Sequence, residues 1–425
     1  MGTQSATATV LSGLPGVRAW QEPLYKHIHE HPELSHQEVE TAKTVAQHLR
    51  DAGFTVTEKV GGTGVVGVLR NGDGPSVLLR SELDALPVKE DTGLPYASTA
   101  VATDPQGKTV PVAHACGHDI HITCLLGASR LMSDHTEAWS GTLIALFQPA
   151  EEVGNGASGM VDDHLADIVG HVDVALAQHV LPLAAGTVGT RSGAVLSAGD
   201  TLRVTLHGRG GHGASPQATV DPIVMAAMAV VRLQSIVSRE IAPTETAVVT
   251  VGSFHAGDKG NVIPDDAVLE INARSYNPQT RQTVLDSIHE IINNEAASSN
   301  APQPPDFVAL DEFPPTINDA ATTATVRTAF DAYFGNGSTE LALQTASEDF
   351  SDIPNALGAP YTYWGLGGID PEQFAAAAKA GTIEKDIPYN HSPKFAPVIQ
   401  PTLDVGTSAL VVASLAWLAG PNAQE

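Results

Sequence analysis

The sequence predicts an α/β protein whose larger domain has a largely parallel central sheet flanked by helices, with a smaller ferredoxin-like α+β domain inserted into it. Three observations lead to this fold class. Over residues 1–197, short apolar runs bounded by Gly and Pro alternate with stretches of helical spacing. Over residues 198–311 the predicted order becomes β-α-β-β-α-β, the ferredoxin-like arrangement. Residues 312–425 return to helices and one strand, so we expect them to complete the larger domain.

The elements of the larger domain follow from apolar periodicity and from Gly and Pro at their ends. Residues Glu33–Ala52 have helical spacing and stop before Gly53, a residue type that favours the conformation found just after a helix. Asn71 and Gly72 are typical of a hairpin turn between two strands. The other predicted elements are strands at Val65–Leu69, Val77–Leu79, Thr142–Phe147, Val172–Ala177 and Thr362–Trp364, and helices at Thr123–Met132 and Ala375–Ala380.

In the inserted domain, the strands alternate apolar and polar residues, whereas the helices repeat apolar residues every three to four positions. The predicted elements are strands at Thr201–His207, Ala247–Phe254, Val268–Tyr276 and Phe307–Leu310, and helices at Pro222–Ile241 and Thr280–Ala297. Two apolar stretches, Val224–Val231 and Ser408–Leu418, are shorter than the roughly 18 residues that a membrane helix needs. We therefore expect both to be buried helices.

Composition excludes several classes of function. The 425 residues include 22 Lys and Arg against 48 Asp and Glu, a formal net charge of −26. Such a charge repels nucleic acid and anionic membranes, so we expect neither as a partner. The two cysteines, Cys116 and Cys124, are too few for a disulfide framework. With no cationic start followed by an apolar run to mark a secretion signal, the sequence predicts a cytoplasmic protein.

Polar residues capable of chemistry follow three predicted strands. Asp84 comes after the strand Val77–Leu79, and the pair Glu151-Glu152 comes after Thr142–Phe147. His179 comes after Val172–Ala177. Ligands of open α/β sheets bind beyond the carboxyl ends of the strands, so three strands that deliver such groups to one edge predict a site there.

The densest cluster of ligand-type residues is the segment His114–His121, with three imidazoles, a thiol and a carboxylate. Cys116 by itself could be a buried core residue, but with His118 two positions on it is better explained as a ligand of zinc, manganese or cobalt. Of Glu151 and Glu152, one could bind a metal and the other act as general base toward a metal-activated water. Cys124 lies on an apolar helix and is expected in the core.

Two further histidines lie in loops. His391 stands between Pro388 and Pro393, where a solvated side chain is the ordinary expectation. His212 lies in a Gly-rich turn, and glycine lets the backbone approach a ligand closely. The turn lacks the Lys-Ser/Thr pair of a phosphate-binding loop, and no Gly-x-Ser-x-Gly segment indicates a serine hydrolase.

A set of motifs extends over nearly the whole chain, from about His27 to Trp417. They are His31-Pro32-Glu33-Leu34 with Glu38, Asp84-Ala85-Leu86-Pro87, His114-Ala115-Cys116-Gly117-His118-Asp119, Gln148-Pro149-Ala150-Glu151-Glu152, Gln178-His179-Val180, Gly210-Gly211-His212-Gly213, Asn261-Val262-Ile263-Pro264-Asp265, Ser347-Glu348-Asp349-Phe350 and Asn390-His391-Ser392-Pro393. In order and spacing they resemble the amidohydrolases of the M20 metallopeptidase clan, in the branch of aminoacylases, hippurate hydrolases and auxin-conjugate hydrolases. One departure is Glu82, which stands where many relatives have aspartate.

The resemblance implies a site with two divalent metal ions, zinc, manganese or cobalt. It assigns Cys116 as the bridging ligand, His118 and His179 to one ion, and Glu152 and His391 to the other. It also implies that Glu151 is the general base and that Asp84 orients a histidine ligand.

The inserted domain would then serve as a lid and dimerisation surface. His212 would reach the scissile carbonyl, in its own site or in that of the partner subunit. Asn261 and Arg274 would hold the substrate, since the guanidinium fork of arginine suits a carboxylate.

The expected reaction is hydrolysis of an N-acyl amino acid to a carboxylate and a free amino acid, by a homodimer. Two alternatives stay open: a dipeptidase or carboxypeptidase on the same scaffold, and a non-catalytic metal- or peptide-binding protein. The acyl group is not specified, because Leu196, Trp364 and Leu366 could line an acyl pocket or belong to the core.

Overall fold

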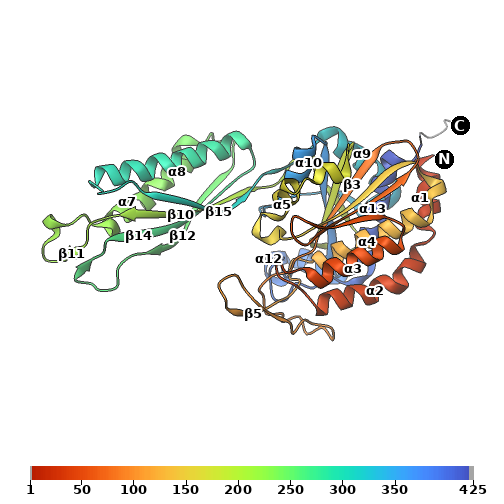
Figure 1. The fold of residues 1–425 in the computed structure, drawn as a ribbon, viewed down its shortest axis with the longest axis horizontal. Helices are drawn as coiled ribbons and strands as arrows, with labels where there is room; N and C mark the ends of the chain where they lie inside the picture. Colours follow the sequence, from red (N-terminus) through yellow and green to blue (C-terminus); the bar gives the residue numbers. More distant parts are fainter. Residues whose placement is uncertain (1, 421–425) are drawn as a thin grey trace. The chain divides into compact units, whose positions relative to one another are not determined.

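The computed structural model describes residues 2–420, which form two compact units (Figure 1). Unit 1 takes the residues up to Gly193, then Ile317–Ala342 and those from Asp349 onward. Unit 2 takes Ala194–Thr316 and Leu343–Glu348. The predicted boundaries of 198–311 were therefore too narrow, and they missed the short second segment. That segment belongs to unit 2 because its backbone hydrogen-bonds to the start of the unit, for example from the Ser197 N–H to the Ala346 carbonyl at 2.9 Å.

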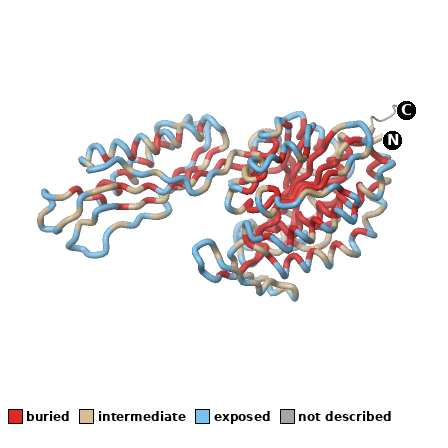
Figure 2. The backbone as a smooth tube through the Cα atoms, viewed as in Figure 1, coloured by how far each residue is buried: buried red, intermediate tan, exposed pale blue. Residues whose placement is uncertain are grey.

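Unit 1 is built on an eight-stranded sheet in the order β1-β2-β6-β3-β7-β18-β8-β17. Its four central strands, β6, β3, β7 and β18, are parallel, and the sheet interior is buried (Figure 2). The strands are β1 (Thr55–Val60), β2 (Gly64–Asn71), β3 (Ser76–Glu82), β6 (Gly141–Gln148), β7 (Val174–Ala184), β8 (Val188–Thr190), β17 (Ser338–Glu340) and β18 (Tyr361–Ile369). Shorter strands of this unit are β4 (Val101–Thr103) and β5 (Thr109–Pro111), whereas the paired strands β9 (Gly193–Leu196) and β16 (Thr316–Asn318) each contain a boundary between the two units.

Helices flank this sheet: α4 and α13 pack on β3 and β7, α3 packs on β1 and β2, and α9 packs on β18. The helices of unit 1 are α1 (Thr3–Leu11), α2 (Leu14–Glu30), α3 (Val39–Asp51), α4 (His118–Asp134), α5 (Gly156–Asp162), α6 (Leu165–Val169), α9 (Ala320–Phe334), α10 (Asp352–Leu357), α11 (Pro371–Ala380), α12 (Ile383–Asp386) and α13 (Ile399–Leu418). The predicted α/β class with a largely parallel sheet is confirmed.

Unit 2 has a four-stranded antiparallel sheet in the order β12-β14-β10-β15, with α7 and α8 packed on it. This is the ferredoxin-like arrangement that the element order predicted. Its elements are β10 (Ala198–His207), β11 (Gly211–His212), α7 (Pro222–Ser235), β12 (Ala247–His255), β13 (Val262–Ile263), β14 (Asp266–Ser275), α8 (Pro278–Ser298) and β15 (Asp306–Phe313).

Two local predictions in unit 1 were wrong. The helix expected from Glu33 begins only at Val39, because Leu34 forms a bridge with Ala85, and the Glu33 carboxylate instead accepts hydrogen bonds from backbone N–H groups in the first turn of α3. Asn71 and Gly72 do not form a hairpin, since β6 inserts between β2 and β3. Both errors come from long-range strand pairing that local residue preferences do not contain.

The two apolar stretches have different fates. The helical segments that contain these stretches, Pro222–Glu240 and α13, are long and apolar enough to span a membrane, judged by length and composition alone. In α13, however, 72% of the apolar segment is buried inside the protein. The prediction of a buried helix holds for α13 but not for α7. There, one side packs on the sheet of unit 2, whereas Val224, Met228 and Val231 are exposed on the other, Val231 by 67%.

Candidate metal centre

Parallel pairing brings the three predicted strand ends to one edge of the central sheet. The register sets Glu82 at the end of β3 opposite Gln148 at the end of β6, and Arg80 opposite Ala177 in β7. Asp84 follows β3 and Glu151 follows β6 after short loops. His179 lies inside β7 and not after it, because this strand continues to Ala184 alongside β18.

The start of α4 brings the thiol and an imidazole to the same edge. Cys116 and His118 flank Gly117, whose φ of 87° is in the left-handed region and whose Cβ, if present, would lie 2.4 Å from Val180. Glycine is therefore required at this close approach. The loop that carries His391 is held against the segment before α4, because the His391 N–H donates a hydrogen bond to the carbonyl of Ala115 at 2.8 Å.

The predicted ligand atoms lie within a few ångströms of one another. Cys116, Glu152 and His391 each place one ligand atom within 4.8 Å of the other two, and so do His118, Glu151 and Glu152. The Nε2 of His118 is 3.9 Å from a carboxylate oxygen of each glutamate. Cys116 Sγ lies 3.4 Å from His179 Nε2, and His391 Nε2 lies 3.3 Å from Glu152. All five predicted ligands, with Glu151, thus form one cluster within unit 1.

Asp84, predicted to orient a histidine ligand, lies beside His118. The Nδ1 of His118 donates to the Asp84 carbonyl at 2.8 Å and is 3.4 Å from its carboxylate, which leaves Nε2 directed at the glutamates. The other carboxylate oxygen of Asp84 accepts from the N–H of Glu152 at 3.0 Å and from the Ser35 hydroxyl at 2.7 Å. Asp84 therefore orients a histidine and a glutamate at once.

Two positioning residues were not identified as such from the sequence. Ser35 holds Asp84, and Glu38 accepts a hydrogen bond at 2.8 Å from the N–H of Ala150, a residue with φ of 51° in the turn before Glu151. Glu38 belongs to the first motif, and Ser35 directly follows that motif's Leu34. That motif was visible, but its contact with two distant loops was not.

The titration of the cluster reflects crowded negative charge. Burial raises the pKa of the Cys116 thiol well above its ordinary value, and the carboxylates of Glu152 and Glu151 raise it further. Burial opposes a charge on His118, but the hydrogen bond to Asp84 and nearby carboxylates outweigh it and raise its pKa to about 10. A thiol and several carboxylates gathered in a buried site require positive charge for compensation.

Comparison with known proteins identifies the family. Residues 78–388, well over half of the chain, match the model of the peptidase family M20/M25/M40. The chain belongs to the M20/M25/M40 peptidase family. It is 35% identical over 351 residues to the IAA-amino acid hydrolase ILR1-like 4 of Arabidopsis thaliana, covering 82% of this chain and 77% of the relative.

Other relatives of this M20 chain have related names. An N-acetyl-L-cysteine deacetylase of Bacillus subtilis is 34% identical over 346 residues, covering 81% of this chain and 79% of the relative. The thermostable carboxypeptidase 1 of Saccharolobus solfataricus is 34% identical over 384 residues, covering 89% and 91%.

Solved structures agree with the family in fold. A putative aminohydrolase from methicillin-resistant Staphylococcus aureus superposes with a TM-score of 0.84 at 28% identity, covering 98% of this chain and all of that one. A Bacillus subtilis protein described as a dinuclear metal binding peptidase from the M20 family gives a TM-score of 0.75 at 25% identity, covering 94% and 98%. The protein is a metal-dependent amidohydrolase of this family.

The cluster fits a divalent metal centre on the evidence of its own atoms. His118 Nε2 and Glu152 Oε1 are buried, lie 3.9 Å apart, and have no hydrogen-bond partner among the described residues 2–420. A buried polar atom without a partner is costly, and an ion between the two would satisfy both. Thiolate, imidazole and carboxylate together suit zinc, manganese or cobalt, and the donor set does not select among them.

Metal uptake by the metal-free protein should release protons, because Cys116 and His118 must both lose one to become ligands. With the pKa of the thiol raised and that of His118 near 10, we expect about two protons released at neutral pH as the site fills. Apparent metal affinity should therefore rise with pH from neutral pH to about 10, where His118 of the metal-free protein loses its proton. The folding stability of the metal-free protein should change with pH in the opposite direction to the metal affinity. The charged His118 stabilises the fold fully below about pH 6.5, and this contribution is lost as the pH rises through about 10.

Calorimetric titration of the ion in two buffers of different ionisation enthalpy measures this release. An observed enthalpy that does not depend on the buffer would contradict the prediction.

The remaining predicted residues belong to unit 2 and fall into two groups. His212 on β11 pairs with Val262 on β13, next to Asn261, and both His212 and Asn261 are exposed. Arg274 lies near the end of β14, where its Nη1 donates to the Thr345 carbonyl at 2.9 Å and to the Ser347 hydroxyl at 3.1 Å. The short β11–β13 pair and Arg274 are thus at opposite ends of the ten-residue strand β14.

The structure shows whether the three apolar residues considered for an acyl pocket belong to the core. Trp364 and Leu366 are fully buried in the core cluster of unit 1, and Leu196 is buried as well. Cys124 is a core residue, as expected. None of the three apolar side chains is therefore available as the wall of an acyl pocket.

Proposed function

We propose that this M20 amidohydrolase hydrolyses the amide bond of N-acyl amino acids and releases a carboxylate and a free amino acid. The observation that carries the proposal is the cluster of Cys116, His118, Glu151, Glu152 and His391 in a chain 34–35% identical to enzymes named for acyl and auxin conjugates of amino acids. We propose that two divalent ions, zinc, manganese or cobalt, are held by Cys116, His118, Glu152, His179 and His391. Such ions polarise an amide carbonyl and lower the pKa of a bound water.

The residues around the ions each take a separate task. Glu151, 6% exposed and beside His118, takes a proton from the attacking water and gives it to the leaving amine. Asp84 keeps His118 in the tautomer whose Nε2 is free to bind. Burial holds the pKa of His179 well below its ordinary value, so its ring stays neutral and able to donate a lone pair.

The lid residues support a dimeric active site. The strand β14 is about 30 Å long at the usual rise per residue, so His212 and Arg274 of one chain cannot contact the same small substrate. We infer that Arg274 binds the substrate carboxylate in one subunit, while His212 and Asn261 of the partner copy reach the scissile carbonyl. His212 would then stabilise the oxyanion of the tetrahedral intermediate.

An apolar surface on unit 2 could join the two copies. Val224, Met228 and Val231 repeat at helical spacing on the exposed side of α7, and β12 is an edge strand whose second edge is unpaired within its four-stranded sheet. Exposed apolar residues in a row and an open edge strand are features of protein–protein contacts. We place the protein in the cytoplasm, because Cys116 must stay reduced to act as a thiolate ligand.

The experiment that tests the proposal is metal restoration with a substrate panel. The purified protein is stripped with a chelator and supplied with zinc, manganese or cobalt in turn. Release of free amine is then measured from N-acetyl, N-benzoyl and long-chain acyl amino acids, with unblocked dipeptides alongside. We expect metal-dependent release from acylated substrates.

The same panel separates the alternatives. Release from unblocked dipeptides alone would contradict the proposal and favour a dipeptidase or a carboxypeptidase; the Saccharolobus relative is named as a carboxypeptidase. No release from any substrate with two ions bound would favour a binding protein, although such a protein would have no need of Glu151.

A further inference from the structure

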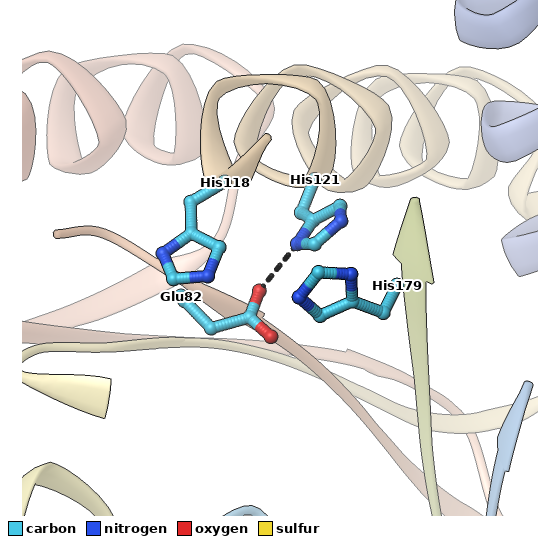
Figure 3. Close-up of side chains that lie close together, drawn as sticks. All are labelled: Glu82, His118, His121 and His179. Atoms are coloured by element: carbon cyan, nitrogen blue, oxygen red, sulfur yellow. Dashed lines mark hydrogen bonds and ion pairs between the residues drawn. The ribbon is translucent and has the colours of Figure 1, made fainter. Parts of the chain in front are cut away.

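His121 is a buried histidine of the centre to which neither the motifs nor the ligand assignment gives a role. It lies one turn after His118 on α4 (Figure 3), and its side chain is buried, with 1% exposed. Its Nδ1 is 2.7 Å from a carboxylate oxygen of Glu82, and its Nε2 is 2.7 Å from the backbone nitrogen of Val180. Both ring nitrogens are therefore engaged by protein atoms.

These two contacts fix the tautomer of His121. A backbone N–H can only donate, so Nε2 must present its lone pair to Val180 and cannot carry a proton. The proton must then be on Nδ1, where it is donated to Glu82. With no lone pair left on either nitrogen, His121 is unable to bind a metal while these contacts last.

The contact with Val180 acts on the neighbouring residue, His179. The N–H of Val180 belongs to the peptide group that follows His179, and the carbonyl of Val180 accepts the Nδ1–H of His179 at 2.8 Å. The rings of His121 and His179 also pack at 70° to each other with centroids 4.5 Å apart (Figure 3). His121 thus restrains both the backbone and the ring of His179, whose Nε2 faces Cys116 at 3.4 Å.

A buried ion pair holds Glu82 in place behind His121. Arg80 is fully buried, pairs with Glu82, donates to Gln148 at 2.9 Å, and lies 3.3 Å from Asp349. Glu82 therefore contacts a fixed cation on one side and the His121 ring on the other.

We propose that His121, held by Glu82, is a positioning residue that aims the His179 lone pair at the metal centre. The inference rests on the proposed role of His179 as a metal ligand. Partners behind a ligand orient it and typically contribute about 10- to 100-fold in metal affinity. Their effect should appear at the ion bound by His179 and not equally at both ions.

Two amide substitutions of His121 test whether the contact with Val180 matters or whether any polar side chain at this position is enough. In His121→Gln, the side-chain oxygen can occupy the place of Nε2 and accept from the Val180 N–H. In His121→Asn, which is shorter by one methylene, the amide can still donate to Glu82 but does not reach Val180. His48→Leu is the matched control, since His48 is a partly buried histidine of unit 1 that stacks on Trp20, away from the ligand set.

Cobalt titration of the metal-free proteins gives a readout that does not depend on activity. Calorimetry resolves the two dissociation constants, and the absorption band of thiolate-bound cobalt follows Cys116. We expect His121→Asn to weaken one binding step by about 10- to 100-fold, and His121→Gln and His48→Leu to keep both steps within about threefold of the unmodified protein.

Several outcomes would overturn the proposal. They are unchanged constants in His121→Asn, an equal loss at both steps in that variant, or a loss of tenfold or more in His121→Gln. The measurement on His121→Gln tests the proposal even if His121→Asn does not fold. Absence of cobalt binding by the unmodified protein would instead contradict the proposed metal centre itself.

Discussion

Replacing Glu151 with glutamine should abolish hydrolysis while both metal ions still bind. The change keeps the size of a side chain that is 6% exposed, so the fold should be unaffected. It removes the group that accepts the proton of the attacking water, and general base catalysis contributes about 100- to 10,000-fold. We expect a fall in kcat of that size, measured on the acylated substrate that the panel identifies, with an unchanged metal content.

The neighbouring glutamate supplies the matched control. Glu152→Gln makes the same chemical change one residue along, but Glu152 lies 3.3 Å from His391 and is grouped with Cys116 as a ligand. This variant should lose metal affinity, and excess metal should restore part of its activity. Near-native kcat in Glu151→Gln, or loss of metal from it, would show that the two roles are assigned wrongly.

Replacing Arg80 with methionine should destabilise unit 1 by about 3–5 kcal/mol. The guanidinium is fully buried, and its removal leaves Glu82 and Asp349 as buried carboxylates without their cation. The pKa of Glu82, which burial would raise, is held well below its ordinary value by Arg80 and His121, so its charge persists in the folded protein. The uncompensated charge is the source of the loss.

Denaturation of the metal-free protein followed by tryptophan fluorescence measures this loss. The four tryptophans, Trp20, Trp139, Trp364 and Trp417, all belong to unit 1, so the signal reports that unit alone. The control is Arg130→Met, which removes an exposed pair with Asp134 and should cost less than about 1 kcal/mol. Equal effects of the two substitutions would contradict the burial argument.

The sequence predicted much of the centre because its chemistry is concentrated in short segments. Cys116 and His118 lie two residues apart, and Glu151 and Glu152 are adjacent, so local spacing already brings together three proposed metal ligands and the proposed general base in two short segments. The β-α-β-β-α-β order likewise gave the topology of unit 2, since each strand and helix there has its own periodicity.

Contacts across long loops were beyond the reach of sequence patterns. Nothing in the spacing of His121 indicated that its ring, on helix α4, would accept the N–H of Val180 on strand β7, 59 residues away. The exposed side of α7 was also missed, because Val224 and Val231 have the composition of a core helix and only the absence of a covering element in unit 2 exposes them.

The sequence by itself determined the fold class, the family and the residues that we propose as metal ligands, because periodicity and short motifs are local properties of the chain. Only the tertiary structure decided which groups orient those ligands. Ser35 and Glu38, in the loop before α3, reach Asp84 and Ala150, and His121 on α4 reaches Val180 on β7. The physical reason is that a buried hydrogen bond depends on distances of about 3 Å, which the packing of helices on the sheet sets and no local pattern encodes.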